Sequence, residues 1–318
     1  MAASDSKAVA WVAVDWGSSH LRIWGMSAEH RPIVETQLAL GMTRLTPDRF
    51  EPTLKEAIEP WLPQASDSIT DVMICGMAGA RGGWQEAPYR EVPCAPLDVT
   101  ELEPIKTQAT NIRVFILPGL SQQTPADVMR GEEAQLSGVL AENPQFSGAI
   151  CLPGTHSKWV SIENGKVKQF ATCMTGETFE WLSSKSVLAN VMNHKGWNDE
   201  AFSQGALSVI DKQAEQAASP FNIRAKVVLG QLSPNDAYSY LSGQLIAQEL
   251  LAHQHFWREQ SSLVLLVGGG SLTRLYEQLL KMLGCEVKVL SGDTCVLRGL
   301  TSAYQQRVLA EQKGASYA

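Results

Sequence analysis

The sequence has no surplus of basic residues, because 26 Lys and Arg face 33 Asp and Glu and leave a formal net charge of −7 over 318 residues. Proteins that bind an extended nucleic acid need a basic surface, so we expect no nucleic-acid partner. The chain also lacks any run of about 18 apolar residues, and its N-terminus has no long apolar core after a basic start. We therefore expect no membrane partner and a cytoplasmic location.

Common signatures of metal and nucleotide sites are missing as well. The 6 cysteines show no Cys-x-x-Cys spacing, which fits reduced structural thiols better than a disulfide framework or a zinc site. No P-loop is present, and the glycine turn at Gly268 departs from the dinucleotide fingerprint because Thr273 stands where that fingerprint needs glycine. With 44% hydrophobic and 19% charged residues, the chain is globular and long enough for one large or two medium domains.

The stretch from Val9 to Trp24 organises the N-terminal half. Its pattern predicts a strand, a reversal at Gly17-Ser18-Ser19 and a second strand, with a third strand over 32–39. Asp15 ends the first strand, where a carboxylate can hold Mg²⁺ together with phosphate oxygens. Gly17 permits close approach of the backbone, and the amides of Ser18 and Ser19 form a candidate phosphate nest. A surface hairpin with a polar turn is the alternative interpretation.

A second copy of this pattern lies about half a chain further on. Residues 146–170 contain an apolar strand, a turn at Gly154-Thr155-His156-Ser157, a strand that begins at Lys158, and a hairpin turn at Asn164-Gly165 before a third strand. His156 either donates to a phosphate or fastens the turn, and Lys158 either adds charge at the phosphates or is an ordinary solvated lysine. The repetition predicts an internal duplication and two domains, at residues 1–143 and 144–318.

The C-terminal half also contains a strand that ends in glycines. Residues 262–267 are continuously apolar and lead into Gly268-Gly269-Gly270-Ser271 and a helix. Glycines at such a turn let an adenosine lie against the backbone, and the N-terminus of the helix favours phosphate. A tight connection between a strand and a helix, with no ligand, is the alternative.

A glycine-rich loop follows the apolar strand over 69–75 and is typical of a small-molecule surface. It contains Arg81 and Trp84, which we take as substrate candidates together with Arg130. Arg81 is best suited to bind a carboxylate bidentately. Its competitors for that role are Arg22, Arg44 and Arg130.

The general base is expected in the first turn of a predicted helix that runs from about Asp127 to Ala141. The candidates are Asp127, Glu132 and Glu133. A carboxylate there can accept the proton of a hydroxyl during phosphoryl transfer. Acids in a first turn also complement the helix dipole, so a structural role is the alternative. Small residues around Gly299 in a last helix predict close packing against the face that carries Gly138.

Taken in order, the segments DWGSSHLR, RGEEAQLSG, LPGTHSKW, LLVGGGS and LRGLTSA resemble the phosphate, connecting and adenosine motifs of the sugar kinase, actin and heat-shock chaperone superfamily. More narrowly, GMAGARGGWQEAPY, PADVMRGEEAQ, LPGTHSKW and TCMTGETF are similar to the 2-dehydro-3-deoxygalactonokinase family. The resemblance spans nearly the whole chain. It implies an α/β fold of two ribonuclease-H-like, actin-like ATPase domains of duplicated β-β-β-α-β-α-β-α type with a cleft between them.

The resemblance also implies a kinase that uses ATP and Mg²⁺ to phosphorylate the terminal 6-hydroxyl of 2-dehydro-3-deoxy-D-galactonate in galactonate catabolism. The N-terminal domain would bind the sugar acid and phosphates, and the C-terminal domain the nucleotide. Carried over, Asp15 serves the metal, Gly17 to Ser19 and Gly154 to Ser157 the phosphates, and Gly268 to Ser271 the adenosine. The superfamily's catalytic carboxylate is usually an Asp, whereas this chain reads Gly131-Glu132-Glu133 there, so the base stays open.

A phosphate-hydrolysing relative of the exopolyphosphatase kind and a non-catalytic ATP-binding switch are the alternatives to a kinase. The preferred epimer of the keto-deoxy acid is undecided, because one or two hydrogen bonds distinguish such epimers. A homodimer is a candidate assembly.

Overall fold

The computed structural model describes residues 8–63, 68–99, 102–193, 196–211, 219–258 and 263–315. The chain forms two compact units. The first unit comprises residues 1–146, 163–169 and 292–318, and the second unit comprises residues 147–162 and 170–291. The compact unit that holds the predicted first domain therefore also contains the last helix. The roles that we attach to residues 1–143 and 144–318 stay predictions.

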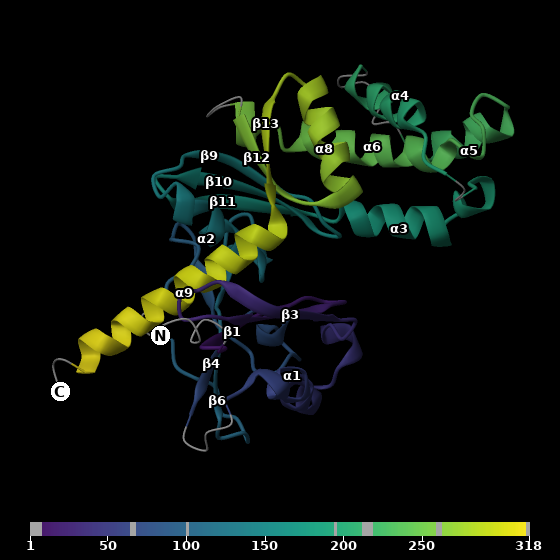
Figure 1. Ribbon diagram of the computed structural model, residues 1–318. Coiled ribbons are helices and arrows are strands. Elements are labelled where there is room, and N and C mark those ends of the chain that lie inside the picture. The colour runs from purple at the N-terminus through teal and green to yellow at the C-terminus, as the bar shows by residue number, and fades with distance from the viewer. Residues whose placement is uncertain are drawn as a thin grey trace, which may run out of the picture. The chain divides into compact units, whose positions relative to one another are not determined.

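The first unit is built on a five-stranded sheet with the order β3-β2-β1-β4-β6 (Figure 1). Strand β1 is antiparallel to β2 and parallel to β4, and β4 is parallel to β6. The bounds are β1 (Trp11–Trp16), β2 (Leu21–Met26), β3 (Pro32–Leu38), β4 (Thr70–Gly76) and β6 (Ile112–Ile116).

The second unit repeats this arrangement in the order β11-β10-β9-β12-β13. Strand β9 is antiparallel to β10 and parallel to β12, and β12 is parallel to β13. The bounds are β9 (Gly148–Leu152), β10 (Ser157–Glu163), β11 (Lys166–Cys173), β12 (Leu263–Gly268) and β13 (Glu286–Ser291). The matching orders and directions confirm the predicted duplication.

The remaining elements surround these sheets. A small sheet of the first unit contains β5 (Tyr89–Glu91), β7 (Gly119–Gln122) and β8 (Asp127–Met129). The helices of the first unit are α1 (Phe50–Ile58), α2 (Glu132–Glu142) and α9 (Gly292–Ala315). Those of the second unit are α3 (Thr175–Lys185), α4 (Asp199–Ile210), α5 (Phe221–Val228), α6 (Ala237–Ala252), α7 (His255–Arg258) and α8 (Gly270–Met282). Among the residues that the structure describes, no helix has the length and apolar character that a membrane span requires.

The predicted start of the helix at Asp127 is wrong. Asp127 lies in β8, and α2 begins five residues later at Glu132. Gly131 precedes the helix with φ of 109°, a conformation that favours glycine. Residues 127–129 pair with β7 as strand β8, so they cannot form the first turn of the predicted helix.

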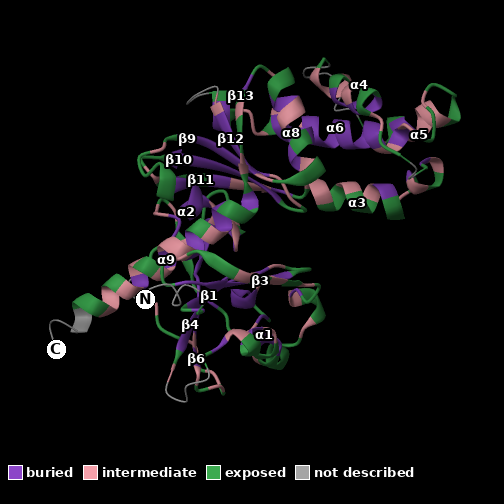
Figure 2. Cartoon of the chain, viewed as in Figure 1, coloured by how far each residue is buried: buried purple, intermediate pink, exposed green. Residues whose placement is uncertain are grey.

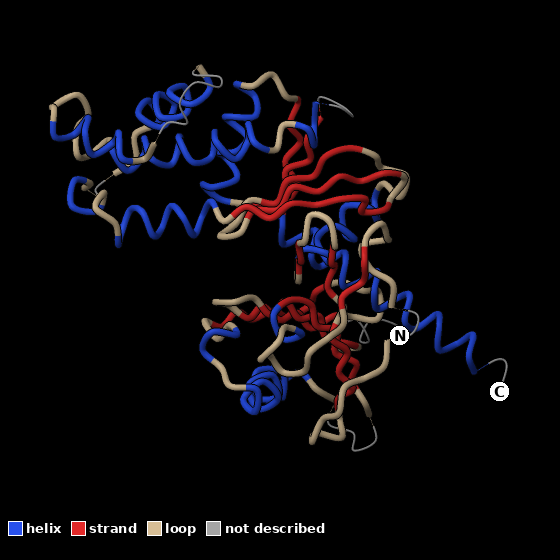
Figure 3. Tube along the Cα trace, turned by 180° about the vertical axis from the view of Figure 1, so that it is seen from behind, coloured by secondary structure: helices blue, strands red, loops and turns tan. Residues whose placement is uncertain are grey.

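The core of the first unit lies on both faces of its sheet. Val12 and Val14 of β1 face α1, whereas Trp11 and Ala13 face the opposite side, where Leu300 of α9 packs. A strand covered on both faces is apolar throughout, which explains the nearly continuous run in the sequence. Figure 2 shows buried residues along the inner strands of each sheet and along α6. In the second unit, α4, α6 and α8 supply residues to one core with β9, β10 and β12, and Figure 3 shows these helices in blue beside the red strands.

Helices α2 and α9 cross at glycines. A Cβ on Gly138 would lie 1.8 Å from the Cys295 carbonyl oxygen, and a Cβ on Gly299 would lie 1.8 Å from the Ala134 carbonyl oxygen. Such approach of two backbones is open only to residues without a side chain. The predicted close packing of these helices is confirmed.

Candidate functional site

The turn between β1 and β2 is held from behind by the segment that follows β3. The carbonyls of Gly17, Ser18 and Ser19 accept hydrogen bonds from the amides of Met42, Thr43 and Gly41, at 3.0, 3.0 and 3.1 Å. Gly41 permits this approach, because a Cβ there would lie 2.2 Å from the Ser18 carbonyl oxygen. Within the described part of the chain, the amides of the exposed Ser18 and Ser19 have no hydrogen-bond partner. Exposed amides of this kind bind anions.

Asp15 lies at the carboxyl end of β1 between Arg22 and Cys75, which are its partners across the sheet. Its Oδ2 forms an ion pair with Arg22, and Arg22 also pairs with Asp293 at the start of α9. Oδ1 accepts a weak contact from the Cys75 thiol, at 3.8 Å. Burial, with the nearby Asp15 charge, holds the pKa of that thiol well above its usual range, so the thiol keeps its proton.

The start of α2 lies against the end of β4. A Cβ on Gly131 would be 3.3 Å from the Cα of Gly76, so the two backbones meet one residue beyond Cys75. Glu132 is half-buried, and its Oε2 accepts the Arg130 amide at 3.1 Å. Asp127 lies apart in β8, with its Oδ1 bonded to the Val128 amide at 2.7 Å. The structure therefore brings Glu132 and Glu133, but not Asp127, to the turn that meets β4.

Glu133 is fully buried. Its Oε2 accepts the Gly131 amide at 2.6 Å, while Oε1 has no hydrogen-bond partner among the residues that the structure describes. Burial and the neighbouring Glu132 charge raise the pKa of Glu133 to about 8. Loss of hydration outweighs the stabilisation by two backbone amides, so Glu133 carries a proton at neutral pH.

This raised pKa makes stability depend on pH. The folded state holds the Glu133 proton up to a pKa of about 8, whereas an ordinary Glu releases it near 4.5. Glu133 therefore costs stability as pH rises through that interval, on the order of a few kcal/mol at its upper end. Glu133→Gln should gain stability relative to the parent between pH 5 and 8, measured by chemical unfolding at both pH values. An equal difference at both would contradict the assignment.

The second turn, at residues 154–157, is held by the first turn of α3. The Thr155 carbonyl accepts the Glu177 amide at 3.1 Å, and a Cβ on Gly176 would lie 2.7 Å from the Gly154 carbonyl oxygen. The amides of Thr155 and His156 make no hydrogen bond to any residue that the structure describes. The His156 ring contacts Glu177, at 2.5 Å between Nε2 and Oε2, so its imidazole fastens the turn to α3. The two turns thus share one construction.

Two polar side chains of this turn point away from solvent. The Ser157 hydroxyl is buried 2.8 Å from the Tyr276 hydroxyl, which donates to Glu249 at 2.8 Å. Lys158 is 5% exposed, and its Nζ donates to the His156 carbonyl at 3.5 Å. Both side chains therefore shape the turn from within, whereas Thr155 and His156 of the same turn are exposed.

The glycine turn begins where β12 ends. Thr273 caps it from α8 by donating its hydroxyl to the Gly269 carbonyl at 3.1 Å. A Cβ on Gly269 or Gly270 would meet nothing within 4 Å, so the space above these residues is open. Beside them lies a cavity of about 250 Å³. Its walls include Thr175, Gly176, Phe179, Trp197, Tyr238, Ser242, Ser271 and Tyr276. Pockets for drug-sized ligands begin at about 300 Å³, so this one suits an aromatic base rather than a whole nucleotide.

The two arginines predicted to bind the substrate, Arg81 and Arg130, differ in how far they are exposed and in their contacts. Arg130 is 9% exposed, stacks on the Tyr89 ring at 4.2 Å and donates to the Ala87 carbonyl at 2.7 Å. Its guanidinium fastens the glycine-rich loop to the body of the unit. Arg81 is exposed and has no hydrogen bond or ion pair among the described residues. Trp84 is half-buried, with its ring 6.5 Å from that of Phe50.

Several groups at these sites carry no signal in the sequence. The pair between Arg22 and Asp293 joins residues 271 positions apart. Glu249 and Tyr276 look like ordinary helical residues in the sequence, yet Tyr276 bonds the Ser157 hydroxyl and Glu249 in turn accepts from Tyr276. Gly41 and Gly176 lie directly against the two turns. Their role in supporting the turns is visible only in the three-dimensional contacts.

Two units with the ribonuclease-H strand order, each with a backbone turn exposed at its first hairpin, define a member of the actin-like ATPase and sugar kinase class. The 2-keto-3-deoxy-galactonokinase family matches residues 15–303, and the chain belongs to that family.

Relatives of known assignment cover nearly the whole chain. A Rhizobium meliloti (strain 1021) protein assigned as a 2-dehydro-3-deoxygalactonokinase is 34% identical over 307 residues, which is 92% of this chain and 96% of that protein. The 2-dehydro-3-deoxygalactonokinase of Escherichia coli (strain K12) is 33% identical over 296 residues, with the same coverage of 92% and 96%. A crystal structure from Sinorhizobium meliloti with the same assignment superposes with a TM-score of 0.82 at 33% identity, covering 93% of this chain and 96% of that one.

Proposed function

We propose that the protein is an ATP-dependent kinase that phosphorylates the terminal 6-hydroxyl of 2-dehydro-3-deoxygalactonate in galactonate catabolism. One observation supports this most directly: both units expose backbone amides at the turn of their first hairpin, the place where such a fold can bind phosphate. Membership of a kinase family disfavours the phosphate-hydrolysing alternative and the non-catalytic switch.

The nucleotide is proposed to bind through backbone and aromatic groups. The amides of Ser18, Ser19, Thr155 and His156 would donate to phosphate oxygens, and Gly268 to Ser271 would lie against the adenosine. The aromatic walls of the 250 Å³ cavity beside Ser271 suit the adenine ring. Ser157 and Lys158 support this site from the interior rather than by direct contact with phosphate.

Magnesium fits the residues that are present. Among the described residues, no group of three or more His, Cys, Asp or Glu side chains could hold a metal ion. Mg²⁺ needs no such group when phosphate oxygens and water complete its shell around one carboxylate. Asp15 would supply that carboxylate through Oδ1, whose one hydrogen-bond contact in the described part of the chain is with the Cys75 thiol. Bound there, Mg²⁺ neutralises charge on the phosphates.

Glu132 is our choice of general base. It is the candidate that is both accessible and placed where α2 meets the end of the Asp15 sheet. Its carboxylate would accept the proton of the acceptor hydroxyl while that oxygen forms a bond to the γ-phosphorus and ADP departs. Glu133, buried and protonated, would hold the Gly131 turn rather than take the proton.

Arg81 and Trp84 are proposed to bind the sugar acid, with the Arg81 guanidinium on its carboxylate. Arg130 shapes their loop. A cytoplasmic location and a homodimer remain proposals, and the acidic net charge supports the absence of a nucleic-acid partner.

The test is ADP release from purified protein with ATP, Mg²⁺ and a panel of galacto- and gluco-configured keto-deoxy acids beside neutral sugars. We expect turnover with the galacto acid, and an increase of about tenfold or more in its KM for Arg81→Ala. Asp15→Asn should raise the Mg²⁺ concentration that gives half-maximal rate. Release of ADP without an acceptor would favour hydrolysis, and a preference for neutral sugars would refute the role of Arg81.

A further inference from the structure

Glu249, near the C-terminal end of α6, is a buried carboxylate that the proposed phosphoryl transfer does not use. It is 5% exposed, and both of its carboxylate oxygens accept hydrogen bonds. Oε1 accepts the Trp159 indole N–H of β10 at 2.9 Å, and Oε2 accepts the Tyr276 hydroxyl of α8 at 2.8 Å. The Thr175 hydroxyl, at the start of α3, also bonds to this carboxylate. One side chain of α6 therefore joins β10, α8 and α3.

The carboxylate and its donors depend on one another. Burial raises the pKa of Glu249, against the opposing effect of the hydrogen bonds from Thr175, Tyr276 and Trp159. A buried polar group that loses its partner carries the full cost of its lost hydration. Each donor therefore holds the carboxylate in place, and the carboxylate holds each donor.

The direction of these hydrogen bonds fixes the side chain of Ser157. The Tyr276 hydroxyl gives its one proton to Glu249, so the Ser157 hydroxyl, 2.8 Å away, donates to the Tyr276 oxygen. Burial, together with the Glu249 charge, holds the pKa of Tyr276 well above its usual range, so the phenol keeps that proton. Ser157 is the last residue of the exposed turn, and this chain of hydroxyls anchors that end.

The other end of the turn is anchored through the same carboxylate. Thr175, which bonds to Glu249, stands two residues before Glu177 in the first turn of α3. The Glu177 amide donates to the Thr155 carbonyl at 3.1 Å. The turn is thus held at Ser157 through α8 and at Thr155 through α3, and both paths meet at Glu249.

The same residues form part of the cavity beside the glycine turn. Thr175 and Tyr276 line this cavity of about 250 Å³, as do Ser242 and Ile246, which precede Glu249 on α6. A displacement of the Glu249 carboxylate would therefore move the cavity wall and the exposed turn together.

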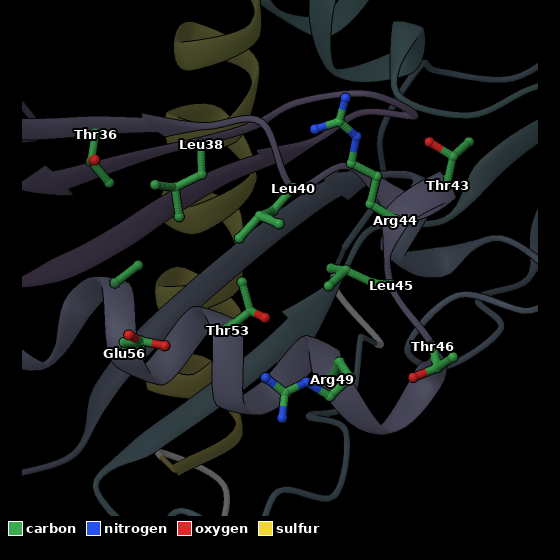
Figure 4. A pocket seen from close by; sticks show the side chains of 11 residues that line it. Thr36, Leu38, Leu40, Thr43, Arg44, Leu45, Thr46, Arg49, Thr53 and Glu56 are labelled. Carbon is green, nitrogen blue, oxygen red and sulfur yellow. The ribbon is translucent and has the colours of Figure 1, made fainter.

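The turn of the first unit is held differently. There the Ser18 carbonyl accepts the amide and the hydroxyl of Thr43, at 3.0 and 2.9 Å. Thr43 is exposed on the wall of a cavity of about 740 Å³ that α1 lines from the other side (Figure 4). Water competes for hydrogen bonds at an exposed position, whereas bonds buried around a carboxylate are stronger. The second turn therefore has the firmer support.

We propose that Glu249 is a positioning residue for the nucleotide, which holds the turn at Ser157 ready for phosphate and in register with the base cavity. The identity of this ligand rests on the proposed function. Amides that are already in place when the phosphates arrive save the cost of ordering them on binding. Damage to the network should consequently weaken the binding of a nucleotide with phosphates more than the binding of adenosine.

Calorimetric titration of the full chain with ATP and Mg²⁺, and separately with adenosine, tests the proposal. Tyr276→Phe keeps the ring on the cavity wall and removes the hydroxyl that joins Ser157 to Glu249. We expect this variant to bind ATP about tenfold more weakly than the parent, and adenosine within about threefold of it. In turnover, KM for ATP should rise by a similar factor while KM for the acceptor stays close to that of the parent.

Tyr240→Phe is the matched control. Tyr240 is also a buried tyrosine of the second unit, it lies on α6, and its hydroxyl accepts the Lys226 Nζ at 2.6 Å. It is not one of the residues that line the cavity. Its variant loses one hydrogen-bonded hydroxyl as Tyr276→Phe does, yet ATP and adenosine should bind to it as they bind to the parent.

Two further variants interrupt the network at other points. Glu249→Gln turns one acceptor oxygen into an amide that faces a donor, and it should lower the affinity for ATP relative to adenosine at least as much as Tyr276→Phe. Thr175→Val removes the hydroxyl of the other path at nearly constant volume and should act in the same direction. The test therefore does not depend on the folding of Glu249→Gln.

Two results would overturn the proposal: an equal loss of ATP and adenosine affinity in Tyr276→Phe, or an unchanged affinity for ATP. The same change of the ratio in Tyr240→Phe would overturn it as well. A parent protein that binds ATP through this network but transfers no phosphate to the keto-deoxy acid would refute the proposed function and leave the role of Glu249 intact. Phosphoryl transfer by Tyr276→Phe with the parent KM for ATP would do the reverse.

Discussion

Glu132→Gln should lower kcat by about 10²- to 10⁴-fold, the range that a positioned general base contributes. Gln keeps the size of the side chain and can still accept the Arg130 amide, so the start of α2 should remain folded. The amide cannot take the proton of the acceptor hydroxyl, so the loss should fall on kcat, with KM for ATP little changed. Single-turnover formation of ADP with the keto-deoxy acid is the measurement.

Two variants serve as controls for that result. Asp127→Asn should stay within a few-fold of the parent rate, because Asp127 lies in β8 and bonds the backbone at Val128. Glu133→Gln should retain most of the rate, since Glu133 is already neutral at pH 7. A fully active Glu132→Gln beside an inactive Asp127→Asn would reverse the choice of base.

The largest effect on stability is expected from Gly299→Ala. The new methyl carbon would lie 1.8 Å from the Ala134 carbonyl oxygen, so α9 must move away from α2. We expect a loss of about 3 kcal/mol, as for severe overpacking, and a midpoint of thermal unfolding lower by roughly 5–10 °C. At a helical position with open space, Gly→Ala stabilises by about 1 kcal/mol. The sign of the change in the free energy of unfolding therefore shows whether the two helices cross as closely as described.

Gln305→Ala is the matched control for this variant, because Gln305 is exposed on the same helix. Its midpoint should stay close to that of the parent protein. Thermal unfolding followed by circular dichroism measures both variants. A Gly299→Ala protein as stable as the parent would contradict the close crossing.

The strands and their duplication could be predicted because each strand satisfies a local rule. Residues 164–165 illustrate this: Asn164 and Gly165 both have positive φ, at 51° and 71°, as the predicted hairpin turn requires. Once these strands pair, the hydrogen-bond pattern of the sheet places Arg22 and Cys75 on either side of Asp15. The boundary at Asp127 failed because a short strand pairing competes with helix formation, and that pairing depends on a partner segment elsewhere in the chain.

The backbone turns of the candidate site could be predicted from the sequence, but the orientation of its side chains could not. Glycine and serine spacing identified the turns, since exposed amides follow from local conformation. Ser157, Lys158 and Arg130 carry polar groups that point inward, and only the packed structure shows this. No local pattern distinguishes a buried arginine that binds carbonyls from an exposed one that could bind a carboxylate, so the sequence leaves Arg130 as a competitor of Arg81.

Helix α9 completes the core of the first unit even though it is the last element of the chain. Its Val296, Leu300 and Ala303 pack with Trp11 and Ala13 of the first strand. During synthesis from the N-terminus, the first sheet is therefore made long before one wall of its core exists. The second unit, whose segments are contiguous apart from residues 163–169, has all its residues earlier. The core of the first unit therefore cannot be completed until the residues of α9 that pack in it have been synthesised.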